Sequence, residues 1–428
     1  MFSLRLLLPI SGWSKNYNKS FLRPDIIAGI TIVAFIIPES IAYAALAGFP
    51  PQTGLYAALA ALLVYFIFGT SKQLSVGPTS TLSLLIGSTI GTLSIVSPNN
   101  LIILGSFVAL VTGIFGILAW LFRMGFVAKF ISHVVITGFS TGVAFFIAAT
   151  QLPKLCGISG APFGFFDSLF FLFSHFNEIH LISLFIGIMT IIVILVFERF
   201  MPKIPGLLVV VIVSTALFSL TEFQELGVNL IGFIPSGLPL ISLPPVSTLH
   251  SMSNFDILKI VGLGFACFIL SYSEGIGTAQ TFAWKYKYKI DNNREFFALG
   301  VSNLLAGLTQ GFPVGGSISR SAVNDEAGSK SPLSSGVSGL VLVVVLIFFV
   351  KFFSNLPEPV LAAIIIFAIL KLVKIHTLKE YFEVNKIEFL YAVANIAGIL
   401  ILGIVEGLII GIIISVLIYY KKYFYKNR

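Results

Sequence analysis

Long apolar runs recur along the whole sequence, and they limit what the chain can fold into. Only 10% of the 428 residues are charged, whereas water-soluble domains carry about 25%, so a normal water-exposed surface cannot be built. Runs of about 18–20 apolar residues match the bilayer core, and in lipid they must be helical because every backbone group needs an internal partner. Continuous rather than alternating apolar residues exclude a β-barrel. The main runs are 26–38, 55–68, 101–122, 134–150, 179–197, 340–353 and 396–420.

These runs predict an all-α polytopic membrane protein with about fourteen transmembrane segments. Two of the segments, 78–95 and 318–328, are weak or short. The final pair is divided at Gly403, because glycine is a poor continuation of a helix. The expected segments are 25–45, 54–69, 78–95, 101–122, 129–150, 179–198, 204–220, 256–283, 293–311, 318–328, 332–353, 357–375, 386–402 and 404–422.

The basic residues predict the orientation of these segments. With the N-terminus in the cytoplasm, most of the 26 Lys and Arg residues lie at inward-facing ends, and the loop 221–255 contains none. This asymmetry obeys the positive-inside rule. It explains the net charge of +8 without a nucleic-acid partner. We therefore expect a cytoplasmic segment 1–24, a cytoplasmic tail 423–428, an extracytoplasmic loop 221–255, and insertion in the plasma (inner) membrane.

The segments divide into two sets of seven, before and after the loop. An odd number of spans gives the two halves opposite orientations, which is the arrangement of inverted-repeat transporters. In each half, a glutamate in the first span is followed at a similar distance by a short helix that glycine introduces. We therefore expect a first repeat at 25–220 and a second at 256–422.

The stretch around Arg320 predicts an anion site. Gly315 and Gly316 interrupt regular helix, and the segment 318–328 that follows is long enough for only about half the bilayer. A half-helix that starts at mid-membrane offers unpaired N–H groups and a partial positive charge. Arg320 adds a full charge in the first turn. An arginine at this depth needs a partner or a cavity, and the sequence leaves Glu39 and Glu274 as alternative partners.

The other half supplies the counterpart of this half-helix. Pro78 suits the first turn of a helix, and Thr79, Ser80 and Thr81 place hydroxyl groups at its start. Because the halves are inverted, both helix N-termini are expected to point at one spot near the midplane.

Two glutamates are candidates for coupling to a cation. Glu39 and Tyr43 lie one turn apart in the first span, and Glu274 and Thr278 lie one turn apart in the eighth. A buried carboxylate can carry a proton. A carboxylate beside a hydroxyl also suits Na⁺, so both ions stay open.

At these residues the chain resembles the sulfate permease (SulP) family of anion transporters. The resemblance implies a seven-plus-seven inverted repeat with a core and a gate domain. It assigns substrate binding to Glu39, Tyr43, Thr79, Ser80, Ser319 and Arg320. Glu274 and Thr278 align with the cation-coupling positions of some bicarbonate transporters in the family, and Glu39 stays a further candidate for the coupling ion. The stretches that carry it are 37–48 (IPESIAYAALAG), 50–56 (PPQTGLY), 68–78 (FGTSKQLSVGP), 130–142 (FISHVVITGFSTG) and 316–324 (GSISRSAVN).

Two departures from the family pattern bear on the interpretation. The sodium sites of related bicarbonate transporters usually have Asp where this chain has Glu274. The family usually continues into a cytoplasmic STAS domain, and the printed sequence stops before one. Two interpretations stay open: the protein naturally has no STAS domain, or the sequence is part of a longer chain.

We expect a secondary transporter of small anions that works by alternating access, first as an H⁺ symporter. Sulfate, bicarbonate, chloride and dicarboxylates all suit the expected site. The alternatives are a Na⁺-coupled bicarbonate-type symporter, an anion channel or exchanger of the same fold, and a nucleobase carrier, which Arg320 disfavours. An enzyme is not expected, since the sequence has no HExxH motif and no Cys/His cluster. No cofactor or bound metal is expected, the lipid bilayer is a partner, and a homodimer is left open.

Overall fold

The fold is described by a computed structural model. It divides into two compact units, each of which takes segments from both predicted repeats. Unit 1 comprises 1–125, 193–221 and 230–356, and unit 2 comprises 126–192, 222–229 and 357–428. The expected segments 1–24, 221–255 and 423–428 lie partly outside the described residues. The residues described are 10–15, 17–91, 93, 98–125, 133–201, 204–220, 226–250, 252–370 and 372–426.

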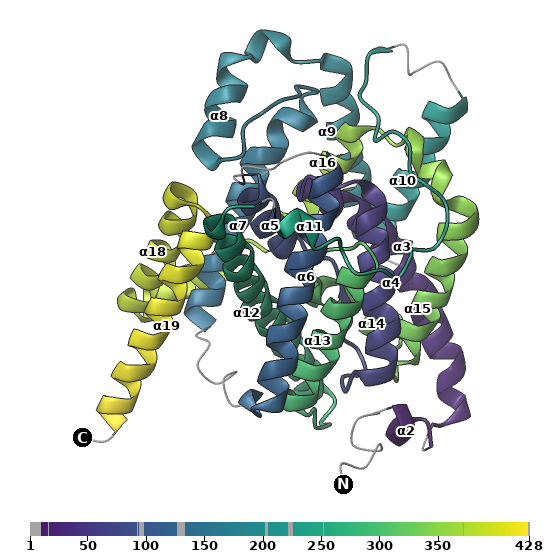
Figure 1. Cartoon of the computed structure of the whole chain (residues 1–428). Helices are drawn as coiled ribbons and strands as arrows, with labels where there is room; N and C mark the ends of the chain where they lie inside the picture. Colours follow the sequence, from purple (N-terminus) through teal and green to yellow (C-terminus); the bar gives the residue numbers. More distant parts are fainter. Residues whose placement is uncertain are drawn as a thin grey trace. The chain divides into compact units, whose positions relative to one another are not determined.

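Unit 1 is a bundle of long helices (Figure 1) that also contains two short strands and the short helices α5 and α14 to which they lead. The strands are β1 (Ser75–Gly77) and β2 (Gly315–Ser317), and each leads into a short helix. After α15 the chain continues through a π-helical turn and a 3₁₀ turn to Asn355. The helices are α2 (Ile10–Trp13), α3 (Leu22–Leu46), α4 (Pro51–Phe68), α5 (Ser80–Ile90), α6 (Pro98–Leu121), α10 (Gly206–Leu220), α11 (Ser247–His250), α12 (Asn254–Lys285), α13 (Asn292–Leu308), α14 (Ile318–Glu326) and α15 (Leu333–Val344).

Unit 2 consists of helices joined by loops in its described part. Helix α9 (Leu181–Phe200) begins in this unit and its last residues belong to unit 1. Within unit 2, helix α7 packs against α16 and α18, and α18 packs against α19. The helices are α7 (His133–Leu155), α8 (Phe165–Ser174), α9, α16 (Glu358–Leu370), α17 (Ile375–Val384), α18 (Lys386–Leu402) and α19 (Ile404–Lys426).

The predominantly helical membrane fold is confirmed, and a helix occupies each of the fourteen predicted segments. Within the described residues, eight helices have the length and hydropathy of a full span. The number of crossings therefore stays a prediction. The sequence did not predict the short helices α2, α8, α11 and α17, nor the two strands. Helix α5 starts at Ser80, later than the expected Pro78, because Ser75–Gly77 is extended and Thr79 caps the helix.

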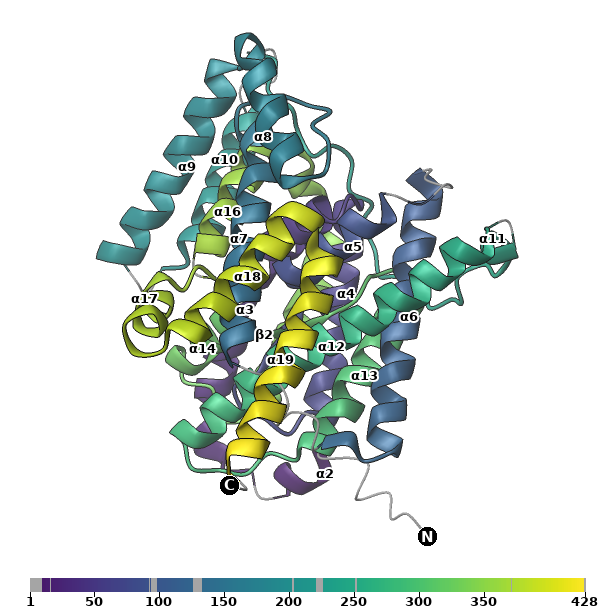
Figure 2. The ribbon, with the colours of Figure 1, turned by 90° about the vertical axis from the view of Figure 1, so that its left-hand side faces the viewer.

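Glycines allow the central helices of unit 1 to pack closely. Helices α6 and α13 run side by side in both views of the ribbon (Figures 1 and 2). A Cβ atom added at Gly116 of α6 would lie 2.8 Å from the Cα atom of Gly300 in α13. Side chains at this crossing would push the backbones apart, as at small-residue contacts between membrane helices generally. Helix α12 contacts both α6 and α13 and also lies against strand β2.

Candidate anion-binding site

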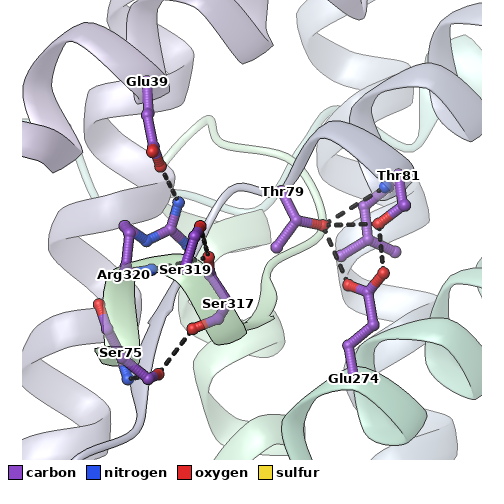
Figure 3. A network of polar contacts seen from close by, with 10 residues as sticks. Glu39, Ser75, Thr79, Thr81, Glu274, Ser317, Ser319 and Arg320 are labelled. Atoms are coloured by element: carbon purple, nitrogen blue, oxygen red, sulfur yellow. Dashed lines mark hydrogen bonds and ion pairs between the residues drawn. The ribbon is translucent and has the colours of Figure 1, made fainter. Parts of the chain in front are cut away.

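A two-stranded ribbon joins the starts of the two short helices. Strands β1 and β2 pair antiparallel, with Val76 opposite Gly316 and Gly77 opposite Gly315. The chain leaves β1 into α5 and leaves β2 into α14, so the two helices start at opposite ends of the ribbon. The sequence predicted two helix N-termini that point at one spot, and the structure brings both starts together in unit 1 (Figure 3).

Side-chain hydroxyl groups cap both short helices. Thr79 accepts a hydrogen bond from the backbone N–H of Leu82, and Ser317 accepts one from the N–H of Arg320. The Ser319 hydroxyl lies 3.1 Å from that of Ser317. Helix α14 has nine residues, so it extends about 14 Å at 1.5 Å per residue, roughly half of the bilayer core. Both helices therefore begin inside unit 1 with N–H groups left over for a ligand.

Arg320 is buried at the start of α14 and forms an ion pair with Glu39 of α3. Its Nη1 atom donates to Oε2 of Glu39 at 2.7 Å. The two side chains are 1% and 6% exposed. Of the two carboxylates that the sequence offered as partners, the structure selects Glu39. The pair is needed because an isolated charge in such a setting is strongly unfavourable.

The pairing leaves part of the guanidinium available. Nε and Nη2 of Arg320 are buried and have no hydrogen-bond acceptor among the residues that the structure describes. Guanidinium N–H groups suit the oxygens of sulfate, phosphate and carboxylate. A Cβ atom added at Gly77 would lie 3.3 Å from Nη2, so this glycine leaves room in front of the free nitrogen. The unused donors point to an anionic ligand between the two helix starts.

Glu274 lies on α12 and contacts the start of the other short helix, α5. Its Oε1 atom accepts a hydrogen bond from the Thr81 hydroxyl at 2.6 Å, and its Oε2 atom accepts one from Thr79 at 3.4 Å (Figure 3). The side chain is partly exposed. No ion pair of Glu274 is found within the described residues. Its contacts are therefore hydroxyl groups, whereas those of Glu39 include a full positive charge.

The remaining predicted residues lie in the same region. Tyr43 is buried one turn after Glu39, beside the Ser80 hydroxyl, and it is close enough to Glu274 for electrostatic interaction. Thr278 is buried on α12 one turn after Glu274, but the hydroxyl groups that bond Glu274 come from α5 instead. All eight residues singled out in the sequence thus lie in unit 1.

Sequence reasoning assigned no role to several side chains that shape the site. The Ser321 hydroxyl accepts a hydrogen bond from the N–H of Ser75 at 2.9 Å, and Asn324 donates to the carbonyl of Gln73 at 2.9 Å. These bonds fasten α14 to β1 and the residues before it. A serine directly before a helix is a common N-cap, so Ser317 could have been found from the sequence. The contacts of Ser321 and Asn324 join residues too far apart in the chain for any local signal.

Comparison with known proteins agrees with this fold and defines the family. The model of the Sulfate permease family matches residues 22–395. A probable sulfate transporter of Mycobacterium tuberculosis is 30% identical over 403 residues, which cover 93% of this chain and 71% of the relative. The sodium-independent sulfate anion transporter of Bos taurus is 30% identical over 411 residues, which cover 90% of this chain and 67% of that protein.

Solved structures show the same fold. The structure of SLC26A9 superposes with a TM-score of 0.89 at 24% identity, covering 98% of this chain and 68% of that one. The transmembrane domain of the cyanobacterial bicarbonate transporter BicA gives 0.77 at 23% identity, covering 92% and 98%. The fold is thus that of a multi-pass membrane transporter. The chain belongs to the sulfate permease family, whose members are transporters and not enzymes.

The buried ion pair makes a prediction about stability. Arg320→Met should lower the free energy of unfolding by about 3–5 kcal/mol, because it leaves Glu39 buried without its counter-charge. The double variant Glu39→Leu/Arg320→Met should lose less than the sum of the two single variants, since no uncompensated charge remains. Thermal unfolding in detergent measures all three. Additive losses would show that the two side chains do not depend on each other.

Proposed function

We propose that the chain is a secondary active transporter of small anions and that the anion binds between the starts of α5 and α14. The observation that carries this proposal is the buried Arg320 beside two helix N-termini. Within the described part of the chain, its Nε and Nη2 groups lack an acceptor. Backbone N–H groups and the helix dipoles supply further positive potential. The site residues are Glu39, Tyr43, Thr79, Ser80, Ser319 and Arg320, as expected from the sequence.

Sulfate is the first candidate for the anion. Both relatives described above carry names of sulfate transporters. A tetrahedral dianion can accept hydrogen bonds from several directions, which suits two helix N-termini and a guanidinium group. Bicarbonate, chloride and dicarboxylates remain the alternative substrates.

The charges of the site favour proton coupling through Glu274. Glu39 and Arg320 compensate each other, so their pair adds no net charge to the site. An ionised Glu274 would then repel an incoming anion, whereas a protonated one would not. Glu39 is less suited to carry the proton, because protonation would break a buried ion pair. We therefore assign H⁺ symport to Glu274, with the hydroxyl groups of Thr79 and Thr81 as its partners.

Sodium is the second candidate for the coupling ion. The Glu274 carboxylate and the hydroxyls of Thr79 and Thr81 form a set of oxygen ligands for a hard cation, and Thr278 lies on the same helix as Glu274. The bovine relative, however, is named sodium-independent. Proton coupling is therefore the primary proposal, and a Na⁺-coupled bicarbonate symporter and an anion channel or exchanger are the alternatives.

We further propose that unit 1 is the core domain that carries the anion and that unit 2 is the gate domain. Alternating access then consists of movement of the core past the gate, with seven spans in each inverted repeat. The distribution of Lys and Arg supports cytoplasmic termini and insertion in the plasma (inner) membrane. A homodimer is compatible with this arrangement.

The anion site is tested by Arg320→Lys. Lysine keeps the positive charge for Glu39 but lacks the forked donors of the guanidinium. Sulfate uptake into proteoliposomes should fall at least about tenfold, the effect of losing about 1.4 kcal/mol, while the unfolding temperature changes little. Arg294→Lys, at a partly exposed ion pair with Asp291, is the control and should retain uptake. Normal uptake by Arg320→Lys would refute the site.

The coupling residue is tested by Glu274→Gln. Uptake by the wild-type protein should rise as the external pH falls, by up to about tenfold per pH unit, because one proton must bind with the anion. Glutamine imitates the protonated carboxyl group, so the variant should bind anion but lose this pH dependence. The measurement compares initial rates at several pH values, with and without Na⁺. If the variant keeps the wild-type pH profile, a residue other than Glu274 carries the proton. If wild-type uptake depends on Na⁺ and the variant loses this dependence, sodium is the coupling ion at Glu274.

A further inference from the structure

The residue before β2 is held by a side chain that no part of the proposed site includes. Val314 is fully buried and directly precedes Gly315–Ser317. Its backbone N–H donates to Oδ1 of Asn303 at 2.9 Å, and Nδ2 of Asn303 donates to the Val314 carbonyl at 3.0 Å. Asn303 is 1% exposed on α13. One amide side chain thus satisfies both polar groups of one residue.

This pair of hydrogen bonds imitates the pairing of a third strand. Polar backbone groups inside a membrane protein need partners within the protein. In the described part of the chain, strand β2 has only β1 as a neighbouring strand. Asparagine carries a donor and an acceptor in the geometry of a peptide group. Leucine offers neither, and an ionised aspartate offers acceptors alone. The requirement at position 303 is therefore specific for a side-chain amide.

A second contact links the same carbonyl to the helix that carries Glu274. The Ser271 hydroxyl donates to the Val314 carbonyl at 2.7 Å. Ser271 lies one turn before Glu274 on α12, and a Cβ atom added at Gly316 would lie 2.5 Å from the Cα atom of Gly275. The entry to β2 is thus held from α13 by Asn303 and from α12 by Ser271.

The position of Arg320 depends on this contact. Only strand β2, whose last residue Ser317 caps α14, separates Val314 from the first turn of α14. A shift of Val314 would therefore move the N–H groups and the guanidinium that face the anion. We propose that Asn303 is a positioning residue that sets the anion affinity by fixing the start of α14 through Val314. The inference rests on the anion site proposed above.

The experiment compares Asn303→Leu with a matched variant of another buried asparagine. Asn395 on α18 is 0% exposed and also donates to a backbone carbonyl, that of Val135, at 3.0 Å, but it lies in unit 2. Hydrogen exchange is measured by mass spectrometry in detergent for the segment 312–320. Sulfate uptake into proteoliposomes then gives the apparent KM and the maximal rate.

Asn303→Leu should speed exchange in the segment 312–320 and raise the apparent KM about tenfold, with a smaller change in maximal rate. Asn395→Leu should leave both the exchange of this segment and the KM unchanged, whatever it does to stability. Ser271→Ala removes a single donor and should raise the KM about threefold, which keeps the test available if Asn303→Leu does not fold.

Two results would overturn the inference. Unchanged exchange in 312–320 would show that Asn303 does not hold the start of α14. Faster exchange with an unchanged KM would show that Asn303 stabilises the fold without positioning the anion site. If the wild-type protein takes up no anion, the proposed function fails, and the exchange result still decides whether Asn303 holds the segment.

Discussion

The rest of the site depends on a buried arginine whose charge must be balanced inside a membrane protein. Arg320 cannot release its proton, so its neighbours must supply negative charge. Glu39 supplies it through a 2.7 Å contact, and Nε and Nη2 of the guanidinium have no acceptor among the described residues. Because one carboxylate is paired with the arginine, the proposed mechanism assigns the change of charge to the other, Glu274. Under that proposal, one small region would both bind the anion and couple its transport to a cation.

The backbone makes this arrangement possible inside unit 1. Two short helices need entry segments that are not helical, and such segments are tolerated at membrane depth only where the protein satisfies their polar groups. The pairing of β1 with β2 satisfies these polar groups along one side of each strand, and Asn303 and Ser271 satisfy those of Val314. The glycines at 77, 275, 315 and 316 allow the close approach that these contacts require. The helix starts are therefore held in place before any ligand binds.

Much of this could be predicted from local sequence signals. Apolar runs located the long helices, and the Gly-Gly and Gly-Pro entries located the two short helices with Arg320 in a first turn. The two strands could not be predicted, because three residues form no pattern and their partners are about 240 positions apart in the chain. The choice of Glu39 over Glu274 as the partner of Arg320 is also set by tertiary packing. Asn303 gave no signal, since an asparagine inside a helix is usually neutral or unfavourable.

The anion is proposed to bind between the starts of α5 and α14. Selenate is a sulfate analogue whose selenium scatters X-rays anomalously, so crystals of the protein grown with selenate locate the anion directly. We expect an anomalous peak within hydrogen-bond distance of the Arg320 guanidinium and close to Thr79 and Ser319. A peak elsewhere, with none beside Arg320, in a preparation that takes up selenate would contradict it.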